Sequence, residues 1–450
     1  PGARFRGDQS EHHLRRSVDG AGSGVSTSLE SSWVSDTFGV LLGGDGIGDL
    51  VRLGLRRNPK RAHLLVSTVL GKHIPTDPAL VRGAADRLAD LVIEHIGVEK
   101  SSAATVLGFA ETATGLGHCV ADRMGAACYL HSTRRCAGGV SVTATFEEGH
   151  SHATTHFIEP TDAALFAPDA PGTEVPLVLV DDEISTGATA LEAIAALHQQ
   201  YPRPSYVVAS LVDMRDADQQ RQCEVDAAEL GVSVEFVALA HGSIDLPKGF
   251  TDEVCALAAP ALNPVGPVTG SLETVRIPWP AEVPDGGRHG FLRTDGPAFG
   301  EATAAVSAAI AGVLDTSAPA VVVGHEEFMY LPLCVAEYLA QEGFTVRYQT
   351  STRSPAYVLD EPGYPLRRGF EFPAPEGDHS AKRYLYNAVV DAADPRGSQV
   401  VFVCDRPADT DELYGSGGLA DVLARAGHNV VVAVVDTPSQ QTLRAAREAL

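Results

Sequence analysis

Residues 177 to 189, LVLVDDEISTGAT, constrain the fold of this chain more than any other stretch. Four apolar residues are followed by two aspartates, a short run of small and hydroxylated residues, and LEAIAALHQQ, whose apolar residues recur at helical spacing. This order predicts a buried strand, a turn and a helix. The backbone N–H groups of such a turn and the dipole of the helix N-terminus favour a bound anion. The sequence therefore predicts a phosphate site beside two carboxylates.

Two carboxylates repel a phosphate but suit a polyhydroxylated, cationic or metal-bound group next to it. A ribose 5-phosphate has both parts. The stretch resembles the phosphoribosyl pyrophosphate (PRPP) signature of type I phosphoribosyltransferases, a pattern that fixes about a dozen positions. The alternative interpretation is an ordinary buried strand followed by a helix that Ser185 or Thr186 caps.

The resemblance implies a role for each residue of this motif. Asp181 and Asp182 would bind the ribose 2- and 3-hydroxyls and oppose the positive charge that develops on the ring, and Glu183 is a candidate base. The residues that would hold the 5-phosphate are Ser185, Thr186, Gly187, Ala188 and Thr189. The implied cofactor is Mg²⁺, which Asp181 and Asp182 would bind indirectly through PRPP.

A second loop is expected to bind pyrophosphate. The pattern predicts a strand over 103–107, a Gly/Thr-rich loop over 108–117, a helix over 118–125 and a second strand over 129–132. In the resembled family this loop binds pyrophosphate and the next strand carries a basic residue to the same anion, which implies Arg134 or Arg135. The implied loop residues are Phe109, Ala110, Glu111, Thr112, Ala113, Thr114 and Gly115, with Lys72 as a further cation. Glu111 departs from the pattern, since a carboxylate beside pyrophosphate requires a metal or a cationic partner.

Two polar segments leave alternatives open. The arginine-rich segment 52–61 is interpreted equally well as solvated charge or as phosphate contacts. The segment EEGHSHATTH, with His150 and His152, suits a flap over the site that touches the acceptor. An inert polar loop is the alternative, and a zinc site is a weaker one because no cysteine or carboxylate frame accompanies these histidines.

The alternation of strands and helices predicts an α/β fold with a mostly parallel sheet, whose ligands bind at the carboxyl ends of the strands. The resemblance implies a type I phosphoribosyltransferase domain with a Rossmann-like sheet, followed by a second α/β domain. We expect a flexible leader over 1–32, the phosphoribosyltransferase domain over 33–255, a Pro/Gly-rich linker over 256–287 and the second domain over 288–450.

The second domain repeats the order of the first. Residues 324–327 parallel 108–111, residues 351–353 parallel 132–134, and SQVVFVCD takes the place of LVLVDD, keeping Asp405 but no phosphate turn. One hypothesis is a degenerate duplicate that no longer binds PRPP. The alternative is that any α/β repeat gives such an echo. Different strand orders in the two halves would exclude duplication.

An arginine- and tyrosine-rich segment, residues 352–389, lies in the second domain of this acidic chain. It could recognise an anionic, planar partner, with Arg353, Arg383 and Tyr384 as acceptor or lid contacts. Its TRSP and RYLYNAV motifs resemble a bacterial family in which a TRSP domain follows a phosphoribosyltransferase. That family is associated with tellurium-resistance-type gene clusters proposed to make a nucleoside-like metabolite. The resemblance extends from about Trp33 onward.

Composition narrows the partners. The net charge of −24 argues against nucleic acid, and no apolar run reaches membrane-spanning length. Seven cysteines without CxxC pairs fit a reducing cytoplasm. We therefore expect an Mg²⁺-dependent phosphoribosyltransferase that transfers ribose 5-phosphate from PRPP to a small-molecule nitrogen acceptor, with a homodimer as the family default. The alternative is a non-catalytic, PRPP-sensing regulatory protein, which would require a DNA-binding partner.

Overall fold

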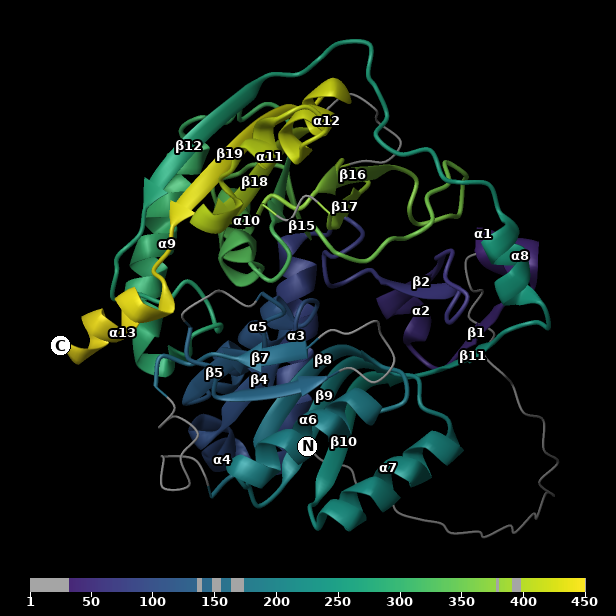
Figure 1. The fold of residues 1–450 in the computed structure, drawn as a ribbon, viewed down its shortest axis with the longest axis vertical. Helices are drawn as coiled ribbons and strands as arrows, with labels where there is room; N and C mark the ends of the chain where they lie inside the picture. Colours follow the sequence, from purple (N-terminus) through teal and green to yellow (C-terminus); the bar gives the residue numbers. More distant parts are fainter. Residues whose placement is uncertain are drawn as a thin grey trace, which may run out of the picture. The chain divides into compact units, whose positions relative to one another are not determined.

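The structure is a computed structural model that describes residues 32–135, 140–147, 155–162, 174–377, 380–390 and 398–449. Residues Ser31–Leu450 form one compact unit, shown in Figure 1. His150 and His152, expected in a flap, lie outside the described residues. Among the described residues, no helix is both long and apolar enough to cross a membrane.

The first half of the chain builds a six-stranded sheet in the order β10-β9-β8-β4-β5-β13. The strands are β10 (Val234–His241), β9 (Tyr206–Asp213), β8 (Leu177–Ile184), β4 (Thr105–Gly108), β5 (Cys128–His131) and β13 (Phe291–Leu292). All neighbours are parallel except β13, which pairs antiparallel with β5. The four apolar residues that open β8 are at most 1% exposed, as expected for a parallel strand covered on both faces. The predicted α/β fold is confirmed.

The second half builds a five-stranded, fully parallel sheet in the order β12-β19-β18-β14-β15. The strands are β12 (Leu272–Pro278), β19 (Asn429–Asp436), β18 (Gln399–Asp405), β14 (Ala320–Gly324) and β15 (Val346–Thr350). Its edge strand β12 lies inside the segment 256–287 that the sequence analysis assigns to a linker. Proline and glycine around β12 obscured this strand, whose residues are mostly exposed.

Four strands of each sheet share one order, which supports duplication. The order β9-β8-β4-β5 corresponds to β19-β18-β14-β15, so the criterion of strand order is met. In each half a hairpin comes next in the chain after the corresponding strands β5 and β15. The hairpin after β5 consists of β6 (Ala144–Glu147) and β7 (Thr155–Ile158), and the hairpin after β15 consists of β16 (Gly369–Pro373) and β17 (Lys382–Tyr386). Gly108 pairs with Val180, and Gly324 pairs with Val403. Asp405 therefore occupies the place of Asp182.

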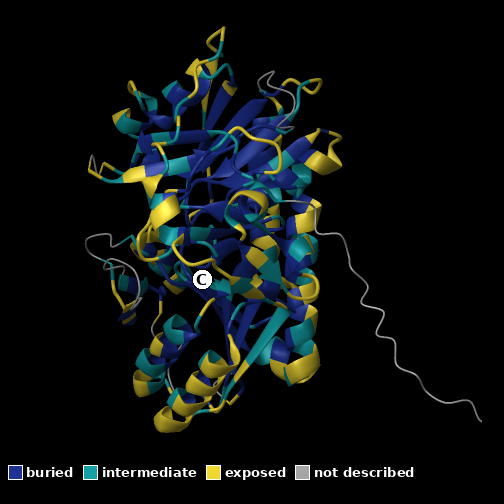
Figure 2. Cartoon of the chain, turned by 90° about the vertical axis from the view of Figure 1, so that its right-hand side faces the viewer, coloured by how far each residue is buried: buried dark blue, intermediate teal, exposed yellow. Residues whose placement is uncertain are grey.

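Helices cover both sheets, and the central strands of both are mostly buried whereas many exposed residues lie on outer helices and loops (Figure 2). The first-half helices are α3 (Pro78–Ile96), α4 (Val98–Ala103), α5 (Thr114–Met124), α6 (Ala188–Gln200), α7 (Ala217–Leu230) and α8 (Phe250–Ala256). The second-half helices are α9 (Gly296–Ala311), α10 (Tyr330–Gln341), α11 (Asp411–Tyr414), α12 (Leu419–Arg425) and α13 (Gln440–Glu448). Helix α10 packs on α5 and α3, so these three helices join the halves between the sheets (Figure 1).

The N-terminal part of the first half forms a small separate layer. It contains α1 (Trp33–Phe38), β1 (Leu41–Gly43), α2 (Ile47–Leu50) and the antiparallel hairpin of β2 (Val51–Leu55) and β3 (His63–Ser67). Strand β1 pairs with β11 (Ser243–Asp245), which follows β10.

Two element boundaries differ from those predicted. Strand β8 continues through Ile184, because its pairing with β9 extends from Leu177 to Ile184, so the three acids lie within the strand rather than after it. Helix α5 begins at Thr114, four residues before the predicted start. The Gly117 N–H already donates to the Ala113 carbonyl, which shortens the preceding loop.

Candidate active site

The two predicted ligand loops meet at one edge of the first sheet. Strands β4 and β8 are parallel neighbours. The loop 109–115, which follows β4, and the acids at the carboxyl end of β8 therefore lie at the same edge of the sheet. The Phe109 N–H donates to the Val180 carbonyl at 3.0 Å, and the Asp182 N–H donates to Asp181 Oδ1 at 2.9 Å. This edge is where ligands of parallel α/β sheets bind.

The turn after β8 leads directly into helix α6, which begins at Ala188. Gly187 has φ +84°, and a Cβ there would lie 2.5 Å from Cys223 Sγ, so both backbone and space require glycine. The Ala188 N–H donates to Thr186 Oγ1 at 3.3 Å. Gly187 offers no side chain to cap the helix, which leaves the first turn suited to an anion.

Lys72 lies between the loop 109–115 and the acids. Its Nζ donates to Thr112 Oγ1 at 2.6 Å and is 3.9 Å from Glu111 Oε1. Burial raises the pKa of Asp182, nearby Lys72 opposes this effect, and Glu183 adds to it. A cation in this position can face both pyrophosphate and the acids.

The β2–β3 hairpin covers Glu183. Arg61 forms an ion pair with Glu183, and its Nε donates to His63 Nε2 at 3.0 Å. Burial and the charge of Arg61 lower the pKa of His63 to about 4, so this imidazole is neutral at pH 7. The sequence did not distinguish solvated charge from phosphate contacts for the arginine-rich segment 52–61. At least Arg61 of this segment lies at the candidate site, where it contacts Glu183. A distance of 122 residues along the chain separates Arg61 from Glu183, which is why no local pattern identified this pair.

The second half contacts the loop 109–115 through Glu111. The Thr352 hydroxyl donates to the Glu111 carboxylate, and the Arg353 N–H lies 3.3 Å from both of its oxygens. Arg353 Nε is 3.9 Å from Glu111 Oε2. The cationic partner that Glu111 requires is supplied by Lys72 and Arg353.

The reverse contact repeats the same geometry. The Thr133 hydroxyl donates to Glu327 Oε2 at 2.6 Å, and the Arg134 N–H donates to Glu327 Oε1 at 2.7 Å. Thr133 and Arg134 correspond to Thr352 and Arg353, and Glu327 corresponds to Glu111. Each half therefore binds the loop of the other, as two subunits of a symmetric dimer would.

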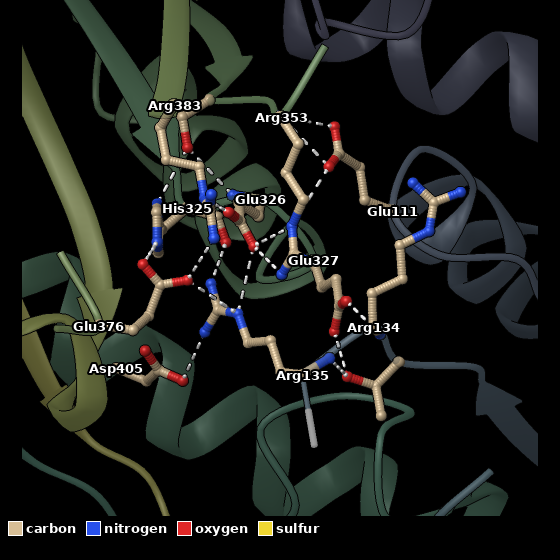
Figure 3. Close-up of polar contacts among 12 residues, drawn as sticks. Glu111, Arg134, Arg135, His325, Glu326, Glu327, Arg353, Glu376, Arg383 and Asp405 are labelled. Atoms are coloured by element: carbon tan, nitrogen blue, oxygen red, sulfur yellow. Dashed lines mark hydrogen bonds and ion pairs between the residues drawn. The ribbon is translucent and has the colours of Figure 1, made fainter. Parts of the chain in front are cut away.

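Arg135 lies elsewhere than expected. Its Nε is 3.3 Å from Glu326 and its Nη1 is 3.4 Å from Asp405, so its guanidinium lies among carboxylates of the second half (Figure 3). The Arg134 Nε donates to His156 Nε2 at 3.4 Å. The reciprocal pairing of the halves explains why Arg135 lies away from the loop 109–115. The arginines that follow β5 face the second half, and Arg353 of the second half faces the loop 109–115.

The residues of the second half that were predicted to contact the acceptor, Arg353, Arg383 and Tyr384, lie close to one another. Thr352 forms a β-bridge with Tyr384, which places the TRSP segment beside strand β17. Arg353 and Arg383 both form ion pairs with Glu326. The Tyr384 ring stacks with Tyr386, with ring centroids 6.3 Å apart.

Glu159, which follows β7, is expected to make the free energy of unfolding depend on pH. It is 1% exposed, and burial raises its pKa to about 7, with Arg288 opposing and Glu327 adding to the effect. The pKa of Glu159 in the folded protein exceeds that of an unfolded glutamate, roughly 4.3. The stability that the protonated side chain contributes is therefore complete below about pH 4.3 and is lost as the pH rises through 7. In urea unfolding at pH 8, Glu159→Gln should be more stable than the wild type by on the order of 2 kcal/mol. At pH 5 the difference should be small.

The matched control for Glu159 is Glu229→Gln, which removes an exposed carboxylate of α7. It should unfold like the wild type at both pH values. Equal stabilisation by the two variants at pH 8 would mean that net charge, rather than the buried carboxyl of Glu159, sets the pH dependence.

The fold and the paired ligand loops define a phosphoribosyltransferase-type α/β protein joined to a second α/β half. A family model described as phosphoribosyl transferase matches residues 50–243. A second, described as the TRSP domain C-terminal to that phosphoribosyl transferase, matches residues 285–423. The chain belongs to this two-domain family.

Several solved structures are similar to part of this chain. An adenine phosphoribosyl transferase from Trypanosoma brucei, in complex with AMP, pyrophosphate and ribose 5-phosphate, is 14% identical, and the match covers 47% of this chain and 82% of that one with a TM-score of 0.31. The enzyme from Rhodothermus marinus is 19% identical, with 43% and 95% covered and a TM-score of 0.29. The enzyme from Giardia lamblia, complexed with 9-deazaadenine, is 18% identical, with 43% and 94% covered and a TM-score of 0.29. No curated protein matches the chain.

Proposed function

We propose that this protein transfers ribose 5-phosphate from PRPP to a nitrogen of a nucleobase-like or other small acceptor and releases pyrophosphate, in the biosynthesis of a nucleotide or nucleoside-like metabolite. The observation that carries this proposal is the meeting of the phosphate turn, the two aspartates and the Lys72-bound loop at the ends of adjacent strands. Family membership supports the same reaction class.

The reaction breaks the C1–O bond to pyrophosphate and forms a C1–N bond, and the acceptor nitrogen loses a proton. Positive charge develops on the ribose ring between two anionic groups. Asp181 and Asp182 would hold the ring hydroxyls and oppose that charge. The turn 185–189 would hold the 5-phosphate, which keeps the ring over the carboxylates.

Pyrophosphate would be held by the loop 109–115 with Lys72 and Arg353, which surround Glu111. Mg²⁺ suits this site because carboxylate and phosphate oxygens are its preferred ligands. When bound it would neutralise pyrophosphate charge, and Asp181 and Asp182 would hold it indirectly through PRPP. Glu183 would serve as the base for the acceptor proton, although its ion pair with Arg61 must then open.

The test is pyrophosphate release from PRPP with Mg²⁺ and a panel of purines, pyrimidines and simple amines. Release that requires one acceptor, and that the Asp181→Ala/Asp182→Ala variant lacks, would support the transfer. PRPP binding without release from any acceptor would favour a PRPP-sensing role instead. An absence of PRPP binding would refute the assignment of residues 177–189.

Arg353→Ala should weaken PRPP use, because the variant removes a cation from the pyrophosphate loop. We expect KM for PRPP to rise by about 10- to 100-fold, with a smaller change in kcat. Arg353→Lys should restore part of the loss, since it keeps the charge but not the planar fork. Steady-state kinetics at saturating acceptor measure both constants.

The matched control is Arg347→Ala, which removes a partly exposed arginine whose nearest acid is Asp77, at 3.3 Å. Its kinetics should equal those of the wild type. If Arg353→Ala lowers only the melting temperature and leaves KM for PRPP unchanged, Arg353 joins the two halves without contacting pyrophosphate.

A further inference from the structure

A cluster of charged side chains occupies the ligand-binding edge of the second sheet. We call it the second-half cluster; its members are Arg135, His325, Glu326, Arg353, Glu376, Arg383 and Asp405 (Figure 3). They come from five separate segments of the chain, and Arg135 comes from the first half. None of them is used by the reaction proposed above except Arg353.

The cluster lies where the first half binds its ligand. His325 and Glu326 follow strand β14 as Phe109 and Ala110 follow β4, and Asp405 occupies the place of Asp182. The phosphate turn is missing, because a 3₁₀ turn, Arg406–Ala408, follows β18 directly. The second half has therefore kept the binding edge of its sheet without the helix N-terminus that would hold a 5-phosphate.

At this edge Glu376 is instead surrounded by two guanidiniums and by the imidazole of His325, whose pKa is lowered by burial. Arg383 Nη2 lies 3.2 Å from Glu376 Oε1, Arg135 Nε lies 3.6 Å from the same oxygen, and His325 Nε2 lies 3.3 Å from Oε2. Against the effect of burial, the contact with His325 and the charge of Arg135 lower the pKa of Glu376 to about 2. A carboxylate in this position is thus held by three groups that suit an oxyanion.

Glu376 differs from the other acids of the cluster in how it is held. Glu326 and Glu327 are fully buried at strand ends, whereas Glu376 follows β16 in a turn and its side chain is 16% exposed. His325 Nε2 and Glu376 Oε2 are buried and make no hydrogen bond of good geometry with any described group. Glu376 is therefore an imperfect partner that a better-placed oxyanion can displace.

Metal binding is the competing interpretation of the same groups. Ligand atoms of His325, Glu326 and Glu376 lie within 4.8 Å of one another, which could suit a cation. However, the guanidiniums of Arg135, Arg353 and Arg383 all form ion pairs with Glu326. With Glu376 displaced, these three guanidiniums outnumber the carboxylates of Glu326 and Asp405, so the remaining positive charge favours an anion over a divalent ion.

We propose that the second half binds an oxyanion, a carboxylate or phosphate group of a ligand, between Arg135, Arg383 and His325, where the carboxylate of Glu376 lies in this structure. The proposal goes beyond the transfer reaction and does not depend on it.

Calorimetric titration with inorganic phosphate and with acetate tests the proposal. The parent protein carries Thr186→Ala and Thr189→Ala, which weaken the first-half phosphate turn. Adding Glu376→Gln should tighten binding of at least one of the two anions by about tenfold or more, because it removes the internal competitor. The anion that gains affinity identifies the ligand group.

Arg383→Gln, added to Glu376→Gln, should abolish the gain, and Arg383→Lys should retain part of it. The control is Glu371→Gln, which removes a carboxylate of the same hairpin that pairs with Lys382 at 3.3 Å and should change nothing. Circular dichroism confirms folding of each variant, and the lysine variant keeps the test valid if the glutamine variant unfolds. No gain with Glu376→Gln, or a gain that survives loss of Arg383, or tighter Zn²⁺ binding in its place, would overturn the proposal.

Discussion

Replacing Asp182 with asparagine is expected to abolish turnover of PRPP, lowering kcat by about 10²- to 10³-fold or more. The amide keeps the size of the side chain and can still bond a ribose hydroxyl, so the variant removes mainly the negative charge. In the proposed reaction that charge would oppose the positive charge that develops on the ribose ring as pyrophosphate leaves. Its effect is largest in the transition state, so kcat should fall far more than the affinity for PRPP.

The fold should survive this change. Burial and the neighbouring Glu183 disfavour the charge of Asp182 more than Lys72 favours it, as the raised pKa of Asp182 indicates, so loss of this charge should not weaken the fold. Thermal unfolding should show a melting temperature equal to or above that of the wild type. Asp218→Asn, which alters an exposed aspartate of α7, is the control and should retain full activity. Substantial turnover by Asp182→Asn would refute the roles given to both aspartates.

Local sequence patterns predict those parts of the site that lie on a single strand and the loop that follows it. The order of apolar residues, acids and small residues at 177–189 is enough to predict β8, the turn and α6, and Gly187 is explained by its own backbone angle. The echo of residues 108–111 in 324–327 leaves both duplication and a chance resemblance open, and the shared order of four strands favours duplication.

Contacts between the halves could not be predicted in this way. Thr352 binds Glu111 across 241 residues, and Thr133 binds Glu327 across 194. These contacts depend on how α5 and α10 pack, which no single stretch encodes. The local pattern therefore places Arg134 or Arg135 at the loop of its own half. Only the paired geometry of the halves shows that Arg353 is the arginine that faces Glu111.

Removing the carboxylate of Glu326 should destabilise the protein by about 3–5 kcal/mol. Its side chain is 0% exposed and contacts three guanidiniums, those of Arg135, Arg353 and Arg383. These arginines come from both halves of the chain. Without Glu326 they face one another in a buried position, and water cannot replace the lost charge. Glu326→Gln keeps the volume of the side chain, so the loss measures charge rather than packing.

Urea unfolding gives the free energy of unfolding, and Asp360→Asn provides the matched control. Asp360 also pairs with an arginine, Arg367, but its side chain is 71% exposed. Exposed pairs contribute less than about 1 kcal/mol because solvent screens them. If Glu326→Gln costs no more than Asp360→Asn, the three arginines find other partners and Glu326 does not hold the halves together. A large loss for Glu326→Gln alone would instead show that one buried carboxylate couples the stability of the second sheet to that of the first.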